Sequence, residues 1–264
     1  LAIGTGADLD DPKRFRFTGS GTNRPSEKAM PTPFSQGAGG MDMPGGRLAE
    51  RWDVHTATPV GEVRLTGSSV VLGLPHGSKT FDGAVLACPA VVSARLLGNQ
   101  AHEILPWLGE VRYSPEVRIY AARHDATDVA LGFHLSPPTP IYSVELYSGT
   151  RGAWGDCPPD WQWALVCASG PDSAHLIEMP AEAARQLLWE RARSVAPQLF
   201  PLEQADVVHD IRWEHAIPQL PAGHYRRLAA YQRRPPVVFA GDWTYHACVE
   251  GAVRSGELAA AAFS

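Results

Sequence analysis

Residues 237–262 constrain the fold of this chain more than any other part of its sequence. The run at 237–240 is short and apolar, which is typical of a buried strand. Gly241 and Asp242 follow, then a polar turn, and a helix is predicted to begin near Val249. A helix start leaves backbone N–H groups unpaired and carries partial positive charge. The sequence therefore predicts a strand, an acidic turn and a helix start in close succession.

This succession resembles the C-terminal flavin-binding motif of the FAD-dependent amine oxidase family, which includes the protoporphyrinogen oxidase and phytoene desaturase types. The resemblance implies FAD as the cofactor, with the Asp242 carboxylate accepting a hydrogen bond from the ribityl chain. It also implies that the helix start points at the pyrimidine edge of the flavin, where unpaired donors stabilise the negative charge of the reduced ring. The cofactor-binding residues implied in this way are Val60, Gly241, Asp242, Val249, Glu250, Gly251 and Ala252. The alternative is an ordinary terminal strand and an Ala-rich helix that close the fold by packing.

Further segments support the resemblance. Residues 58–63 resemble the family's PV-x-x-V element, in which the backbone of the first Val, here Val60, pairs with the adenine edge; a plain strand start is an equal alternative. Residues 39–44 and 81–89 also resemble FAD-domain segments of the family. In the C-terminal helix, Gly251 and Gly256 are expected to let the backbone approach the cofactor or the sheet closely.

The dinucleotide-binding fingerprint that usually opens such an enzyme is not recognisable in this chain. Gly4-Thr5-Gly6 has only three residues before it, and Leu9 stands where the third Gly belongs. Gly19-Ser20-Gly21 is followed by Arg24-Pro25, which prevents the required helix. We therefore expect the second part of a longer architecture. It is either one subunit of a split enzyme or the C-terminal product of a nicked or truncated chain, and Leu rather than Met at residue 1 fits processing.

Composition excludes several classes of function. The net charge of −5 and a pI of about 6.1 argue against binding to nucleic acid or to an anionic membrane. No apolar run is long enough to span a bilayer, and no signal-peptide pattern opens the chain. The four cysteines form no CxxC pair, so no metal site is predicted and a reduced, cytoplasmic protein is expected. Three of the 23 Lys and Arg residues are lysines, which suggests a bacterial source of high GC content.

The predicted fold class is α/β (α+β), with a mixed-sheet substrate domain and the C-terminal portion of a Rossmann-like FAD-binding domain. The strands are predicted at 54–56, 60–66, 69–74, 80–88, 111–122, 141–147, 161–168 and 237–240, and the principal helices at 45–52, 89–97, 180–195 and from 249. The predicted domains are an irregular opening segment (1–38), an FAD-domain part with adenine-side strands (39–97), a substrate domain (98–210) and a flavin-contacting strand and helix (211–264).

Three residues are candidates for the catalytic machinery. The family carries a Trp and then a Gly-x-Tyr before its final motif, and the resemblance implies that Trp213 stacks by the flavin while Tyr225 forms a wall of the substrate pocket. His246 lies in the predicted turn and is a candidate general base, with a hydrogen-bonded turn residue as the alternative. The family's usual Lys near flavin N5 has no counterpart, because no Lys follows Lys79. This departure favours a dehydrogenase or desaturase type over an amine oxidase mechanism.

The resemblance thus predicts the C-terminal part or subunit of an FAD-dependent oxidoreductase. It would transfer a hydride from a small organic substrate, at an amine or C–H centre, to the flavin. Activity is expected only in a heteromer with a second polypeptide or segment that supplies the N-terminal dinucleotide-binding half. A non-catalytic partner subunit that stabilises a separate flavoenzyme chain, and an inactive fragment, are the alternatives.

Overall fold

The computed structural model describes residues 49–125, 127–134, 141, 143–148, 160–231 and 233–264. The predictions for residues 1–38 and 39–44, and most of the helix predicted at 45–52, lie outside the described residues. The chain divides into two compact units, one formed by residues 1–54 and 115–214 and the other by 55–114 and 215–264. We call them the sheet unit and the C-terminal unit.

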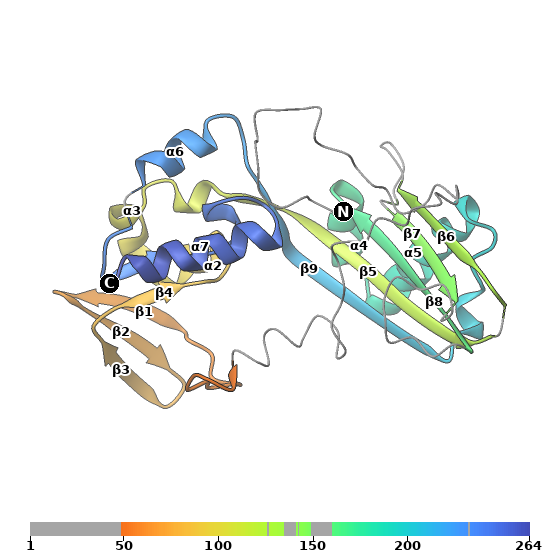
Figure 1. Cartoon of the computed structure of the whole chain (residues 1–264), viewed down its shortest axis with the longest axis horizontal. Coiled ribbons are helices and arrows are strands. Elements are labelled where there is room, and N and C mark those ends of the chain that lie inside the picture. Colours follow the sequence, from red (N-terminus) through yellow and green to blue (C-terminus); the bar gives the residue numbers. More distant parts are fainter. Residues whose placement is uncertain (1–48, 126, 135–140, 142, 149–159, 232) are drawn as a thin grey trace, which may run out of the picture. The chain divides into compact units, whose positions relative to one another are not determined.

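The C-terminal unit begins with an antiparallel three-stranded sheet (Figure 1), made of β1 (Glu62–Thr66), β2 (Ser69–Leu74) and β3 (Gly77–Phe81). The first two strands confirm their predictions, and the bounds of β2 agree at both ends. The strand predicted at 54–56 is wrong, because that segment is exposed and leads into a turn.

The single strand predicted at 80–88 is also wrong, because the chain breaks at Gly83 into β3 and the short β4 (Ala84–Leu86). A Cβ atom at Gly83 would lie 2.3 Å from the Phe263 ring and 3.1 Å from the carbonyl oxygen of Pro236, so a larger residue here would displace this ring.

A two-stranded parallel sheet joins the two ends of this unit's sequence. β10 (Val237–Phe239) pairs with β4 in the register Val237↔Ala84, and all three residues of β10 are buried. After β4 comes α2 (Ala90–Leu97), which confirms the helix predicted at 89–97, although Pro89 is its N-cap rather than a residue of its first turn. The remaining elements of the unit are η2 (Gly98–Gln100), α3 (Ala101–Ile104), η3 (Leu108–Glu110), α6 (His224–Ala230), η5 (Asp242–Thr244) and α7 (Val249–Ala261).

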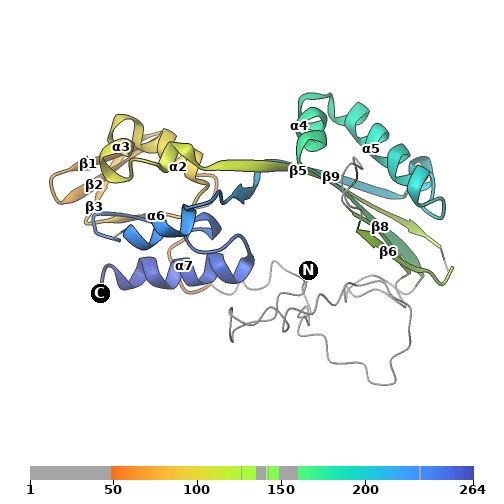
Figure 2. The ribbon, with the colours of Figure 1, turned by 90° about the horizontal axis from the view of Figure 1, so that it is seen from above.

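The sheet unit is built on five strands in the order β6-β7-β8-β5-β9. They are β6 (Ala130–His134), β7 (Ser143–Ser148), β8 (Trp161–Ser169), β5 (Arg112–His124) and β9 (Val207–Gln219). β5 and β9 each continue into the C-terminal unit. Two helices, α4 (Pro171–Glu178) and α5 (Ala181–Val195), lie on one face of this sheet (Figure 2), and η4 (Leu202–Gln204) precedes β9.

The core of the sheet unit lies between the helices and the alternate residues of the strands. Val117, Ile119 and Ala121 of β5 pack there with Leu188 and Trp189 of α5. The mixed α/β class is as predicted. No helix in the described part of the chain is both long and apolar enough to cross a lipid bilayer.

Candidate functional site

The turn after β10 brings together most of the predicted cofactor-binding residues. Gly241 has φ 135°, a conformation that favours glycine, and a Cβ there would lie 3.1 Å from Cδ1 of Trp243. Its N–H donates to Oγ of Ser255 at 2.7 Å, and Ser255 in turn donates to the carbonyl of Ala252. The end of the strand is thereby fixed against α7.

Asp242 presents a half-buried carboxylate at this turn. The backbone N–H of Trp243 donates to its Oδ1 at 2.8 Å. In the described part of the chain, no side chain donates a hydrogen bond to it. Burial raises the pKa of Asp242, and the backbone hydrogen bond only partly offsets this effect. Because no side chain of the described residues donates to it, the carboxylate in its ionised form can accept a further hydrogen bond.

Tyr113 belongs to the surroundings of Asp242. Its hydroxyl oxygen accepts a 2.8 Å hydrogen bond from the N–H of Ala90 at the start of α2. Burial, with smaller contributions from the charges of Asp242 and Cys88, raises the pKa of Tyr113 to about 12. The phenol therefore stays neutral beside the carboxylate at physiological pH.

Trp243 anchors the turn to the rest of the unit. Its side chain is fully buried, and its Nε1 donates to the carbonyl of Cys88 at 3.3 Å. Its own carbonyl lies 2.9 Å from Nε2 of the buried His224, and Trp107 meets both rings edge-on. His224 thus holds α6 against the turn.

The start of α7 offers unpaired backbone donors. Cys248 is the N-cap, and its Sγ accepts from the N–H of Gly251 at 3.3 Å. The N–H groups of Val249 and Glu250 have no acceptor among the described residues. Gly251 does allow a close approach, but to the backbone of His246, since a Cβ would lie 2.0 Å from the carbonyl oxygen of His246. The first turn of α7 can therefore donate to an external acceptor.

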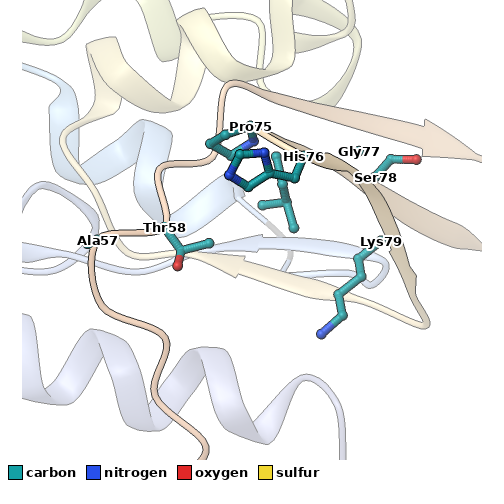
Figure 3. A pocket seen from close by; sticks show the side chains of 8 residues that line it. Ala57, Thr58, Pro75, His76, Gly77, Ser78 and Lys79 are labelled. Carbon is teal, nitrogen blue, oxygen red and sulfur yellow. The ribbon is translucent and has the colours of Figure 1, made fainter.

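The other predicted site residues lie in different places. Val60 is half-buried against the core of the C-terminal unit. Near it in the sequence, Ala57 and Thr58 line an open pocket of about 310 Å³ (Figure 3), with His76 and Lys79 across it.

Of the predicted catalytic residues, Tyr225 and His246 are exposed in the C-terminal unit, and Tyr225 packs edge-on against His224. Trp213 belongs to the sheet unit, where the guanidinium of Arg118 lies 5.4 Å from its ring centroid.

The sequence profile of the family described as flavin containing amine oxidoreductase matches residues 13–263. The chain belongs to this family. No curated protein matches the chain significantly.

Solved structures at low sequence identity share the fold of this chain. A putative protoporphyrinogen oxidase from an Exiguobacterium species is 18% identical, over 83% of this chain and 49% of that one, with a TM-score of 0.69. Cyclohexylamine oxidase from Brevibacterium oxydans is 17% identical, over 85% and 52%, with a TM-score of 0.62. A wild-type putrescine oxidase, bound to putrescine, is 19% identical, over 85% and 53%, with a TM-score of 0.61. The chain therefore spans about half the length of the structures it matches.

Sequence reasoning did not find several residues that shape the turn at Gly241, Asp242 and Trp243 in this flavin amine oxidoreductase. Ser255 and Trp107 contact Gly241 and Trp243 only in the folded chain, and only there does Tyr113 lie within the electrostatic influence of Asp242. For Ser255, a signal is its place one helical turn after Gly251, on the buried side of α7. The other two carry no sequence signal, because their contacts join distant segments.

Proposed function

We propose that this chain is the flavin-contacting part of an FAD-dependent oxidoreductase. Two neighbouring features together carry the proposal. The half-buried carboxylate of Asp242 has no side-chain donor among the described residues. The N–H groups of Val249 and Glu250, at the start of the next α-helix, have no acceptor among those residues. Asp242 would accept a hydrogen bond from a cofactor hydroxyl. The helix start would donate to an electron-rich edge of the flavin.

Bound FAD would supply the acceptor for a hydride taken from a small organic substrate. Within that site, we assign Trp213 to the flavin face, Tyr225 to a wall of the substrate pocket and His246 to proton transfer. The exposure of Tyr225 and His246 supports these roles, since both side chains are accessible. We further propose a cytoplasmic location, in keeping with free thiols at Cys88, Cys167 and Cys248.

We also propose that a second polypeptide or segment supplies the dinucleotide-binding half. Parallel sheets are normally buried and of more than two strands, whereas β4 and β10 pair only with each other in the described residues. Val85, in the middle of β4, is exposed. On α7, Val249 and Val253 are one helical turn apart and 72% and 53% exposed. The added half would extend the sheet and cover this apolar face, consistent with matched structures about twice as long.

The decisive variant is Asp242→Ala in the flavoprotein as purified, with any polypeptide that accompanies it. We expect flavin binding to weaken by about tenfold or more, because a hydrogen bond to a charged group contributes about 1.5–3 kcal/mol. The control is Asp82→Ala, which removes an exposed carboxylate of the same unit. Visible flavin absorbance per chain measures the occupancy.

Unchanged flavin occupancy in folded Asp242→Ala protein would overturn the proposal and favour a non-catalytic partner subunit. Native mass spectrometry of the same preparation tests the second polypeptide. A chain that carries FAD alone would contradict the need for it, whereas a flavin-containing heteromer would support it.

A further inference from the structure

The two faces of the five-stranded sheet differ in chemistry. One face carries the apolar residues that pack on α4 and α5. The residues that alternate with them on β5 are Glu116, Arg118 and Tyr120, which therefore lie on the opposite face. Cys167 of β8 stands opposite Arg118 and Ser143 of β7 stands opposite Cys167, so they continue this polar row across the sheet.

Arg118 is held in a fixed position on this face. Its Nε donates to Oε1 of Glu116, whose side chain is only 7% exposed. Its guanidinium lies over the Trp213 ring, 5.4 Å from the centroid. Burial disfavours the charge, but the hydrogen bonds to Glu116 and Tyr120 outweigh burial and raise the pKa of Arg118. The guanidinium is therefore charged, oriented by a buried carboxylate and stacked on an indole.

Part of this guanidinium remains available to a ligand. The Arg118 side chain is 35% exposed, and among the described residues no carboxylate or carbonyl accepts a hydrogen bond from its two Nη atoms. A guanidinium has five N–H donors in a planar fork, so one edge can bind Glu116 while the Nη edge binds a second carboxylate. Trp213 is 42% exposed beside it and can contact an apolar group.

Arg123, on the same strand, provides a comparison, because each nitrogen of its guanidinium has a side-chain partner. Its guanidinium also lies over an aromatic ring, 4.8 Å from the centroid of Phe200. Its Nε donates to Gln162, its Nη1 donates to Gln204 and its Nη2 pairs with Asp125. All three nitrogens of Arg123 thus have side-chain acceptors, whereas the one carboxylate bound by Arg118 among the described residues is that of Glu116. A role in joining structural elements explains Arg123, whereas no carboxylate or carbonyl of the described residues accepts from the Nη atoms of Arg118.

We propose that Arg118, stacked on Trp213 and oriented by Glu116, binds the carboxylate of an organic substrate that carries an aromatic or other planar group. This inference rests on the proposed function, because it names the substrate class for the same enzyme. Glu116 acts as a positioning residue. The uncharged Cys167 thiol, whose pKa burial raises, adds no negative charge opposite Arg118.

Binding of phenylacetate to the full chain, measured by isothermal titration calorimetry, tests the proposal. Phenylacetamide and phenethylamine are the matched neutral and cationic probes. We expect phenylacetate to bind at least tenfold more tightly than either, because the carboxylate makes charge-assisted hydrogen bonds. Equal binding of phenylacetamide, tighter binding of phenethylamine, or no binding of phenylacetate would overturn it.

Variants of Arg118 show whether phenylacetate binds at this residue, and circular dichroism shows whether each variant is folded. Arg118→Gln and Arg118→Lys are each expected to weaken phenylacetate binding about tenfold, since Lys keeps the charge but loses the planar fork. Arg123→Gln is the control and is expected to leave the affinity unchanged. If Arg118→Lys binds as well as the unmodified chain while circular dichroism shows it folded, the assignment to Arg118 is wrong.

The same titration on Asp242→Ala protein distinguishes the two proposals. Phenylacetate binding that persists there, while flavin occupancy is unchanged from the parent, supports the carboxylate site and overturns only the flavin assignment. Loss of phenylacetate selectivity with normal flavin binding in Arg118→Lys supports both proposals.

Discussion

The backbone N–H of Gly241 donates a 2.7 Å hydrogen bond to Oγ of Ser255. This contact joins the end of β10 to the middle of α7, and Ser255 is fully buried. The side chain of Ser255 on α7 therefore holds the turn that carries Asp242 in position. The stability of the predicted cofactor site and that of α7 are coupled at this point.

Ser255→Ala is expected to destabilise the chain by about 1–3 kcal/mol, because the Gly241 N–H loses its acceptor inside the protein. Urea unfolding measures the loss. Ser194→Ala, which removes an exposed hydroxyl from α5, serves as the control and should change little. Equal stability of the two variants would show that the Gly241–Ser255 contact contributes nothing.

Two glycines of α7 should respond in opposite ways to alanine. Gly251→Ala is expected to cost about 1–3 kcal/mol, because its Cβ would lie 2.0 Å from the carbonyl oxygen of His246 and the loop must move. Gly256→Ala is expected to stabilise by up to about 1 kcal/mol, since no atom lies within 4 Å of its Cβ position and Ala favours a helix. Thermal unfolding of both variants checks the difference in sign, and destabilisation by Gly256→Ala would contradict it.

Asp242→Asn should separate stability from cofactor binding. Burial raises the folded-state pKa of Asp242, so its contribution to stability is present at low pH and lost as pH rises through that pKa. At neutral pH, the Asn variant without flavin is therefore expected to be more stable than the parent, by less than about 1 kcal/mol because solvent screens the half-exposed charge. Its flavin affinity should fall.

Urea unfolding of the flavin-free Asp242→Asn protein at pH 7 and near pH 3 measures this effect. The stabilisation should be present at pH 7 and disappear at the acidic pH, where the parent carboxyl is protonated. A gain of equal size at both pH values would exclude the charge of Asp242 as its cause.

Cys167 should make the chain less stable at alkaline pH. Burial raises the pKa of its thiol to about 11 from an ordinary 9.0, despite the hydrogen bond to Ser143 and the charge of Arg118. A raised folded-state pKa gives stability that is present below pH 9 and lost between pH 9 and 11, by at most about 3 kcal/mol. Cys167→Ala should therefore flatten this part of the stability curve, as measured by urea unfolding. A Cys167→Ala curve as steep as that of the parent would contradict the burial of this thiol.

Local patterns were sufficient for elements whose identity depends on neighbouring residues. The apolar run of β2, the helical spacing of α5 and the Pro89 start of α2 were all predicted close to their observed bounds. β9 was not predicted as a strand, because its apolar residues do not lie on its less exposed face. Asp210 and Arg212 are half-buried, whereas Trp213 and Ile217 are exposed. Its strand structure depends on pairing beside β5.

The sequence by itself determined the strand–acid–helix order around Asp242 and, through it, the family and the candidate cofactor site. Only the tertiary structure decided that β4 pairs with β10, that Ser255 and Trp243 hold the turn, and that Arg118 lies over Trp213. The physical reason is the same in each case. A turn or a helix start depends on residues adjacent in sequence, whereas pairing, stacking and burial depend on segments that meet only when the chain folds.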